Sequence, residues 1–318
     1  MKILLVIVGV LIFIAVIQQI LKKAIIGQKK KYSIGLYEGD SILDLKPSKN
    51  NPILTKFDVT DVVASFVADP FIVKDSGKYY LFMEVKSKRR RDIGEIGLAV
   101  GENIYDLKYQ KIILKEDFHL SYPYVFKKDN EFFMFVESGE NRDLRLYKAV
   151  DFPFEWKIER VFLEGKRLAD PTLVELNGIY YIFVTDMDDE VMRLYVSEDL
   201  KELKEHKLSP FYKKDWSKIR NGGRIFIDKG KIYRFAQNCE RYYGEKVDMY
   251  EITKLNENEF EEKFIKTILS PSGKGWNSDQ MHTIDIIKED KYYAIVDGGS
   301  FEKENYYVIN KFLRKIFK

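Results

Sequence analysis

Two aspartates that each precede a proline are the residues best suited to chemistry in this sequence. Asp69 stands in the string ADPF and Asp170 in ADPT, so the same local pattern occurs twice. Proline fixes φ, and at the start of a strand it would aim the preceding carboxylate inward. Two carboxylates across a sugar-sized gap can cleave a glycosidic bond, one as base or nucleophile, while another group supplies a proton or tunes a pKa. The alternative is that Asp-Pro only caps a turn.

An internal repeat puts both aspartates at the same place in a larger unit. Each repeat predicts a strand, a tight turn and a second strand rich in aromatic residues. The five repeats begin at Pro70, Pro123, Pro171, Gly223 and Thr283. Starts that lie roughly 50 residues apart suit the four-stranded blades of a propeller, so the sequence predicts an all-β, five-bladed β-propeller. A β-sandwich with coincidental repetition is the alternative.

The last repeat lacks a full outer strand before the chain reaches Lys318. We therefore expect the stretch YSIGLYEG, which begins at Tyr32, to pair with the last blade and close the ring. Closure of this kind removes the exposed sheet edges that would otherwise promote aggregation.

The inner strands of a propeller converge on one axis, so equivalent positions of the repeats should face a common cavity. The ten positions just before and at the end of each repeat carry five carboxylates, one histidine and one glutamine, whereas ordinary strand positions would be apolar or varied. We predict that this axis holds a site. Its catalytic candidates are Asp69, Asp170, Glu137 and Glu84, and its substrate-binding candidates include Tyr122, Gln237 and Asp297.

Arginines also recur at matched places. Arg145 and Arg193 lie on equivalent third strands, and Arg220 and Arg224 flank a Gly-Gly pair. A guanidinium group binds a carboxylate or phosphate in bidentate fashion, which makes these arginines suitable for substrate contact, and Arg145, Arg193 and Arg224 are the candidates. In the alternative interpretation they pair with two inward acids, Glu95 and Asp248.

Two of the three histidines lie in or near the repeats. His119, in FHLSYPYVF, is a further candidate for substrate contact, and His282, in MHTIDI, falls at the axis in the fifth repeat. In a polar cavity His282 could shuttle a proton or orient water around a central cation. A hydrogen-bonded histidine with a structural role is the alternative.

Charge is unevenly distributed along the chain. The formal net charge is +3, yet the first 31 residues hold six lysines and no acid, which leaves a mildly acidic body. Because a nucleic-acid binder needs a basic face to displace counterions from phosphates, we expect no nucleic-acid partner. The single Cys239 excludes an intramolecular disulfide and a cysteine-based zinc site.

The amino-terminal segment predicts a membrane anchor. Nineteen uncharged residues lie between Lys2 and Lys22, and at about 1.5 Å rise each they would span a bilayer core as one transmembrane helix. No small-residue cleavage site follows, which favours an uncleaved single-pass anchor over a signal peptide. We expect an anchor with a basic flank at 1–31 and a propeller domain at 32–318. The lysines after the segment favour a cytoplasmic body, and an exported body is the alternative.

Several spaced motifs resemble a known family. They are IGLYEGDSILDL from Ile34, HLSYPYVF from His119, ADPTLV from Ala169, NGGRIF from Asn221 and MHTIDI from Met281. Together they resemble the propeller domain on the amino-terminal side of plant glucosamine inositolphosphorylceramide transferases. The resemblance implies a glycan or glycolipid ligand. Because transferase activity in the plant proteins resides in a different domain, a partner glycosyltransferase is a further expectation.

The arrangement is also similar, more distantly, to the five-bladed propellers of glycoside hydrolase families 43 and 32. This resemblance implies that Asp69 is a base or nucleophile and that Asp170 tunes a pKa. The general acid of those families has no match, because Gly222 stands in its place. The glutamates that could replace it are Glu84, Glu137 and Glu240.

Two functions follow from these expectations. The first is a membrane-anchored enzyme that cleaves or transfers glycosyl groups of cell-surface or lipid-linked glycans. The second is a non-catalytic glycan-binding module that serves a partner glycosyltransferase. His282 is placed like a family-43 histidine beside a central metal, so the resemblance implies a calcium ion, although no cofactor is required. A pure scaffold would poorly explain the charged axis.

Overall fold

The computed structural model describes residues 28–88 and 93–303, and the predicted membrane segment lies outside them. Residues 32–300 form one compact unit. In the described ranges no helix has the length and apolar character needed to cross a bilayer. The compact unit Tyr32–Ser300 contains the propeller.

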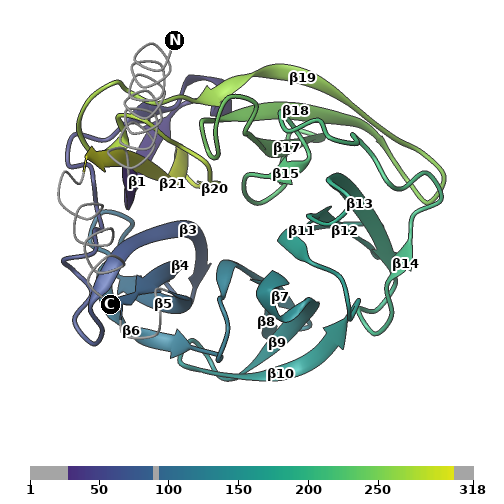
Figure 1. The fold of residues 1–318 in the computed structure, drawn as a ribbon, viewed down its shortest axis with the longest axis horizontal. Coiled ribbons are helices and arrows are strands. Elements are labelled where there is room, and N and C mark those ends of the chain that lie inside the picture. Colours follow the sequence, from purple (N-terminus) through teal and green to yellow (C-terminus); the bar gives the residue numbers. More distant parts are fainter. Residues whose placement is uncertain (1–27, 89–92, 304–318) are drawn as a thin grey trace, which may run out of the picture. The chain divides into compact units, whose positions relative to one another are not determined.

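Five antiparallel sheets form this unit and surround a common centre (Figure 1). The first blade comprises β3 (Ala64–Asp75), β4 (Lys78–Ser87), β5 (Ile93–Gly101) and β6 (Lys108–Leu114). The second comprises β7 (Ser121–Lys128), β8 (Glu131–Ser138), β9 (Asp143–Asp151) and β10 (Glu155–Phe162). The third comprises β11 (Leu168–Leu176), β12 (Ile179–Asp186), β13 (Val191–Ser197) and β14 (Lys204–Glu205).

The fourth and fifth blades complete the ring. The fourth comprises β15 (Arg220–Asn221), β16 (Phe226–Asp228), β17 (Lys231–Asn238), β18 (Lys246–Leu255) and β19 (Phe260–Leu269). The fifth runs β20 (Ile284–Lys288), β21 (Tyr292–Lys303), β1 (Gln28–Gly39) and β2 (Lys46–Pro47) from inside to outside. Short 3-10 turns are η1 (Ile42–Asp44), η3 (Gly139–Asn141) and η4 (Gly275–Asn277).

The predicted all-β, five-bladed propeller is therefore confirmed, and so is its closure by the stretch that begins at Tyr32. Strand β1 pairs with β21, so the amino-terminal stretch supplies the outer half of the last blade. Ile34 and Leu36 on β1 are fully buried. This strand addition covers the edge of β21 and joins the two ends of the propeller by backbone hydrogen bonds.

The prolines of the repeat lie within the inner strands, not at their start. Strand β3 begins at Ala64, before Pro70, and the pairing of β3 with β4 shifts register between Ala68 and Phe71. Equivalent shifts occur in the second and third blades. Proline cannot donate to a sheet ladder and is tolerated at such bulges. The repeated Asp-Pro thus marks a bulge in the inner strand rather than a strand start.

The residue before each of these prolines has a left-handed backbone. The φ angles are 50° at Asp69, 52° at Tyr122 and 52° at Asp170. Such angles are uncommon for residues other than glycine and cost on the order of 1–3 kcal/mol, so the surroundings must hold them. The bulge turns the backbone N–H of each residue away from its own sheet. A side chain of another blade can then accept a hydrogen bond from this N–H.

The core lies between neighbouring blades. Phe135 on β8 is fully buried and stacks on Phe126 of β7, with ring centroids 6.0 Å apart. The same apolar cluster includes Ile182 of β12 in the next blade. The aromatic residues that the repeat places on the second strand therefore fill the space between blades.

We expect Phe135→Ala to lower the free energy of unfolding by about 3–5 kcal/mol, because the cavity would lie between two blades. Urea titration followed by tryptophan fluorescence measures this loss. Phe57 is the matched control, since its side chain is 85% exposed and Phe57→Ala should change stability by less than about 0.5 kcal/mol. Equal losses in the two variants would contradict the assignment of the core.

Candidate functional site

Acids from four blades gather at the axis, all buried except the half-buried Glu137. They form the axial acid cluster, which we define as Asp69, Glu84, Glu137, Asp170 and Asp297. Their carboxylates accept backbone N–H groups across blade boundaries. The N–H of Asp69 donates to Asp297 Oδ2 at 3.0 Å. The N–H of Tyr122 donates to Asp69 Oδ2 at 3.2 Å, and that of Asp170 donates to Glu137 Oε2 at 3.1 Å. Each left-handed residue is thus held by an acid of the preceding blade.

His282 lies between two acids of the cluster. Its Nδ1 is 2.6 Å from Asp297 Oδ2, and its Nε2 is 3.8 Å from Asp69 Oδ1. The Tyr32 ring stacks on the imidazole at a centroid distance of 4.6 Å. Burial acts to lower the pKa of His282, but Asp297 and then Asp69 raise it above its ordinary value. The imidazole is thus held between the two acids by Asp297 and by the stacked Tyr32 ring.

Asp69 is almost fully enclosed. Its Oδ1 accepts the Thr283 hydroxyl at 2.9 Å, and its Oδ2 accepts the Tyr122 N–H. Burial raises the pKa of Asp69 to about 6, while His282 opposes the rise. Both oxygens of the predicted base thus have internal partners, and the carboxylate keeps most of its charge at neutral pH.

Asp170 is clamped by an arginine. Arg220 Nε donates to Asp170 Oδ2 at 2.6 Å, and Arg220 Nη2 donates to Oδ1 at 2.8 Å. Gln237 Nε2 donates to the same Oδ1 at 3.3 Å and to the Asn221 carbonyl at 2.8 Å. This bidentate pair neutralises the predicted modulator and fixes its orientation.

The two glutamates of the cluster have raised pKa values. Burial and the neighbouring Asp170 raise the pKa of Glu137 to about 8, although Arg220, 3.7 Å away, lowers it. Burial, followed by the charge of Asp69, raises the pKa of Glu84 well above its ordinary value. Within residues 28–88 and 93–303, Glu84 Oε1 has no hydrogen-bond partner. Glu137 therefore holds a proton at neutral pH.

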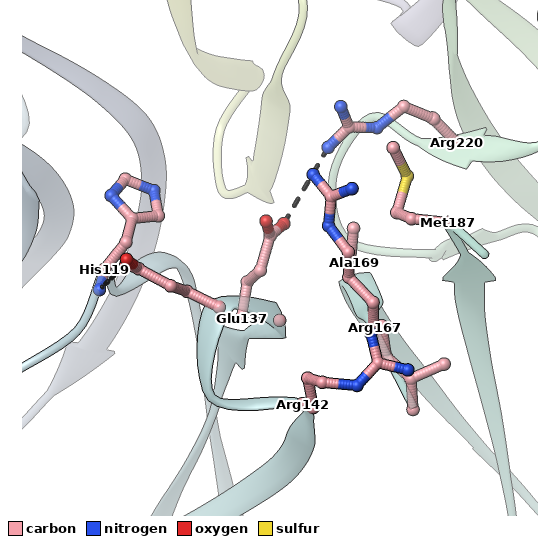
Figure 2. A pocket seen from close by; sticks show the side chains of 10 residues that line it. His119, Glu137, Arg142, Arg167, Ala169, Met187 and Arg220 are labelled. Atoms are coloured by element: carbon pink, nitrogen blue, oxygen red, sulfur yellow. Dashed lines mark hydrogen bonds and ion pairs between the residues drawn. The ribbon is translucent and has the colours of Figure 1, made fainter. Parts of the chain in front are cut away.

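A pocket of about 500 Å³ opens beside this cluster, and Figure 2 shows Glu137 and Arg220 on its wall. His119 lies on one side, and Arg142, Arg167 and Met187 lie on the other. Asp69 and Asp170 do not line it. Glu137 is thus the acid of the cluster that reaches this space.

Tyr243 lies over the arginine of the cluster. Its ring is 5.0 Å from the Arg220 guanidinium and meets His282 edge-on, with ring centroids 5.4 Å apart. Tyr243 is 36% exposed, so it offers an aromatic face to solvent next to the buried acids. Its backbone carbonyl accepts the side-chain amide of Gln280, which ties the loop to the fifth blade.

The outer arginines are not brought to the axis. Arg145 pairs with Asp143 at 2.9 Å, and Arg193 pairs with Asp186 at 2.7 Å. Arg224 is the exception, because it reaches Asp285 of β20 at 2.9 Å and donates to a backbone carbonyl of β7. All three have acidic partners, as in the second interpretation of the sequence, but these are not Glu95 or Asp248.

His119 and Tyr122 lie next to the cluster with different surroundings. The N–H of Gly94 donates to His119 Nδ1 at 2.7 Å, and His119 Nε2 is 3.7 Å from Glu84 Oε1. Burial and then Lys86 lower the pKa of His119 to about 4. The Tyr122 hydroxyl is hydrogen-bonded to Thr172 and accepts the N–H of Gly223, so this tyrosine is part of the buried frame.

The calcium ion implied by resemblance can be tested against the donor atoms. Asp69, His282 and Asp297 each offer a ligand atom, and these atoms lie within 4.8 Å of one another. Calcium takes six to eight oxygen ligands. Both oxygens of Asp297 already accept two donors each, from His282, Thr283 and Asp69. These residues do not fit a directly bound calcium ion.

Four residues of the site were not singled out by their repeat positions. They are Tyr243, Arg220, Arg142 and Arg167. Arg220 precedes the Gly-Gly motif, which was the one available signal. The others lie outside the strands, where the repeat has no fixed offset. Of the predicted residues, the structure brings together the axial acid cluster with His282, Gln237, Tyr122 and His119.

The chain matches known families over most of its length. Residues 27–299 match the family model described as glucosamine inositolphosphorylceramide transferase 1, N-terminal. The chain belongs to this family. It is 35% identical over 297 residues to glucosamine inositolphosphorylceramide transferase 1 of Oryza sativa subsp. indica, and 34% identical to that of Arabidopsis thaliana. Each match covers 84% of this chain but only about 40% of the plant protein.

Solved structures share the family's fold at low identity. A thermostable family-43 glycoside hydrolase is 16% identical with a TM-score of 0.56, covering 80% of this chain and 92% of that one. An α-L-arabinofuranosidase catalytic domain from Coprinopsis cinerea is 8% identical with a TM-score of 0.54, covering 83% and 97%. These likenesses bear on the fold. Together with the transferase relatives they indicate a carbohydrate-related propeller protein.

We expect Arg220→Ala to lower the free energy of unfolding by about 3–5 kcal/mol, since the substitution leaves the buried Asp170 carboxylate without its cation. Denaturant titration at pH 7 measures the loss. Lys254 is the control, because its ion pairs are half exposed and Lys254→Ala should cost less than about 1 kcal/mol. A loss below 1 kcal/mol for Arg220→Ala would show that Asp170 finds other partners.

Glu137 should make stability depend on pH. Its folded pKa, about 8, lies above the ordinary value of 4.5, so the folded state keeps a proton that the unfolded chain releases. The free energy of unfolding should therefore fall as the pH rises from 4.5 to 8. Glu137→Gln should flatten part of this slope, measured by urea titration at several pH values. The exposed Glu131→Gln should leave the slope unchanged, and a slope unaltered by both variants would refute the assignment.

Proposed function

We propose that this propeller binds a saccharide in the pocket beside the axial acid cluster. The observation that carries the proposal is the pocket of about 500 Å³, whose wall combines a protonated carboxyl at Glu137 with a guanidinium at Arg220. Pockets of this size with a few fixed polar groups suit small ligands. The aromatic face of Tyr243, beside Arg220, adds an apolar surface of the kind that a sugar ring can cover.

Recognition is better supported than cleavage because the two aspartates have structural partners. Asp69 accepts a hydroxyl and a backbone N–H, and Asp170 is clamped by Arg220. Tyr122 has the same left-handed bulge before proline without a carboxylate, so the repeated Asp-Pro is explained by the backbone alone. Neither aspartate lines the pocket.

The family supports a role beside a transferase. The plant relatives are named as glucosamine inositolphosphorylceramide transferases, and the chain spans about 40% of their length. We propose that the propeller presents a glycan or glycolipid to a glycosyltransferase. Anchorage by the uncharged segment between Lys2 and Lys22 would keep it near lipid-linked or cell-surface glycans, on either side of the membrane.

Hydrolysis is the second candidate, and one observation favours it. Burial raises the pKa of Glu137 to about 8 and that of Asp69 to about 6. Near neutral pH the first side chain is therefore suited to act as a general acid and the second as a base. In this reaction Glu137 would protonate the leaving oxygen, and Asp69 would activate water or attack the sugar carbon, with Asp170 as modulator. Glu84, whose pKa burial also raises, does not line the pocket.

Calorimetry with panels of cell-surface glycans and glycolipid headgroups, combined with mass spectrometry of the mixtures, separates these functions. We expect saccharide binding without product. Glu137→Gln should weaken binding about tenfold or more, because the amide changes the hydrogen bonding at the wall. Glu131→Gln, at an exposed site, should bind like the native protein.

Two other outcomes decide against binding alone. Hydrolysis would be favoured if the native protein formed a product and neither Glu137→Gln nor Asp69→Asn did, with both variants folded by circular dichroism. Absence of both binding and product across the panels would overturn the proposed function.

A further inference from the structure

Three arginines from the second, third and fourth blades line the pocket around Glu137. They are Arg142, Arg167 and Arg220. In Figure 2 the Arg167 side chain extends along the pocket toward Glu137 and Arg220. A pocket that offered only neutral hydroxyl recognition would not need guanidinium groups, because these are costly to desolvate without an anionic partner. The partners of each arginine therefore indicate what the pocket can hold.

Two of the three guanidinium groups are already engaged. Arg220 holds Asp170 through two hydrogen bonds. Arg142 Nη2 donates to Asp188 Oδ2 at 2.8 Å and to the Gly165 carbonyl at 2.6 Å. These groups shape the pocket and leave little capacity for a ligand.

Arg167 is different. Across residues 28–88 and 93–303, its guanidinium has no ion-pair or hydrogen-bond partner, and the residue is exposed. Its backbone, by contrast, is fixed: its N–H donates to Asp188 Oδ2 at 3.3 Å, and its carbonyl accepts the Met187 N–H at 2.9 Å. The same Asp188 carboxylate thus anchors Arg142 and the backbone of Arg167. A firmly held backbone presents one uncompensated cation at a defined place on the pocket wall.

We propose that the pocket takes an acidic saccharide whose carboxylate or phosphate is bound by Arg167, an inference that rests on the proposed function and names its substrate class. A guanidinium binds either anion through two parallel N–H donors. The anion lies at the Arg167 guanidinium, and the sugar ring occupies the rest of the pocket beside Glu137.

Calorimetry on the full chain tests the inference with matched probes. A trigalacturonate supplies carboxylates, mannose 6-phosphate supplies a phosphate, and galactotriose and mannose are their neutral counterparts. We expect one acidic probe to bind at least about tenfold more tightly than its neutral counterpart. The probe that binds identifies the anion.

The variant Arg167→Gln should remove that tenfold preference, so that the acidic probe and its neutral counterpart bind with equal affinity. Arg167→Lys, which keeps the charge but not the fork of donors, should retain part of it. Arg160→Gln is the control, because Arg160 is an exposed arginine on β10 that does not line the pocket. It should behave like the native protein, and equal melting temperatures would show that all variants are folded.

The outcomes separate the inference from the proposed function. Equal binding of acidic and neutral sugars, unaffected by Arg167→Gln, would overturn the inference and leave saccharide binding intact. Arg167-dependent binding of inorganic phosphate without binding of any sugar would support the anion site and overturn the saccharide function. Binding of no probe would overturn both, and equal weakening by Arg160→Gln would show a general charge effect and overturn the inference.

Discussion

The structure depends on carboxylates that accept backbone N–H groups across blade boundaries. At three boundaries a left-handed residue before proline points its N–H at an acid of the preceding blade, at 3.0 to 3.2 Å. Each bulge would otherwise leave a buried donor unpaired, which costs about 1–3 kcal/mol, in addition to the strain of the left-handed backbone. The acids thus make the inner strands of the propeller possible, and they are held in turn by Arg220 at Asp170 and by His282 at Asp297.

This constraint gives the axial acids two roles that a sequence cannot separate. Five carboxylates that face one cavity are typical of a glycosidic site, but the same arrangement arises when acids close a ring of backbone donors. The distinction comes from where each oxygen is used. The carboxylate oxygens of Asp69, Asp170 and Asp297 accept hydrogen bonds from internal partners. Glu137, by contrast, both accepts the N–H of Asp170 and lines the pocket. The site is therefore displaced from the axis toward the second and third blades.

The repeat made much of this predictable. Its equal offsets placed Asp69, Glu84, Glu137 and Asp297 at the axis, and the short last repeat predicted that the stretch from Tyr32 would close the ring. The partners of the arginines could not be predicted, because Arg142 and Arg167 lie in connections between strands that differ in length from blade to blade. The position of Pro70 at a bulge could not be predicted either, because a bulge within a strand and the start of a strand have the same local sequence.

The Gly-Gly pair at the entry to the fourth blade has a physical reason to be glycine. Gly223 has φ of 135°, and a Cβ at this residue would lie 1.8 Å from the carbonyl oxygen of Ile284. A Cβ at Gly222 would approach the His282 carbonyl oxygen to 3.1 Å, so its neighbours would have to shift by a few tenths of an ångström. The backbones of the fourth and fifth blades meet at this point through a parallel bridge. A side chain at Gly223 would therefore force the two backbones apart, and the acid of the axial acid cluster that lines the pocket comes from the second blade, as Glu137.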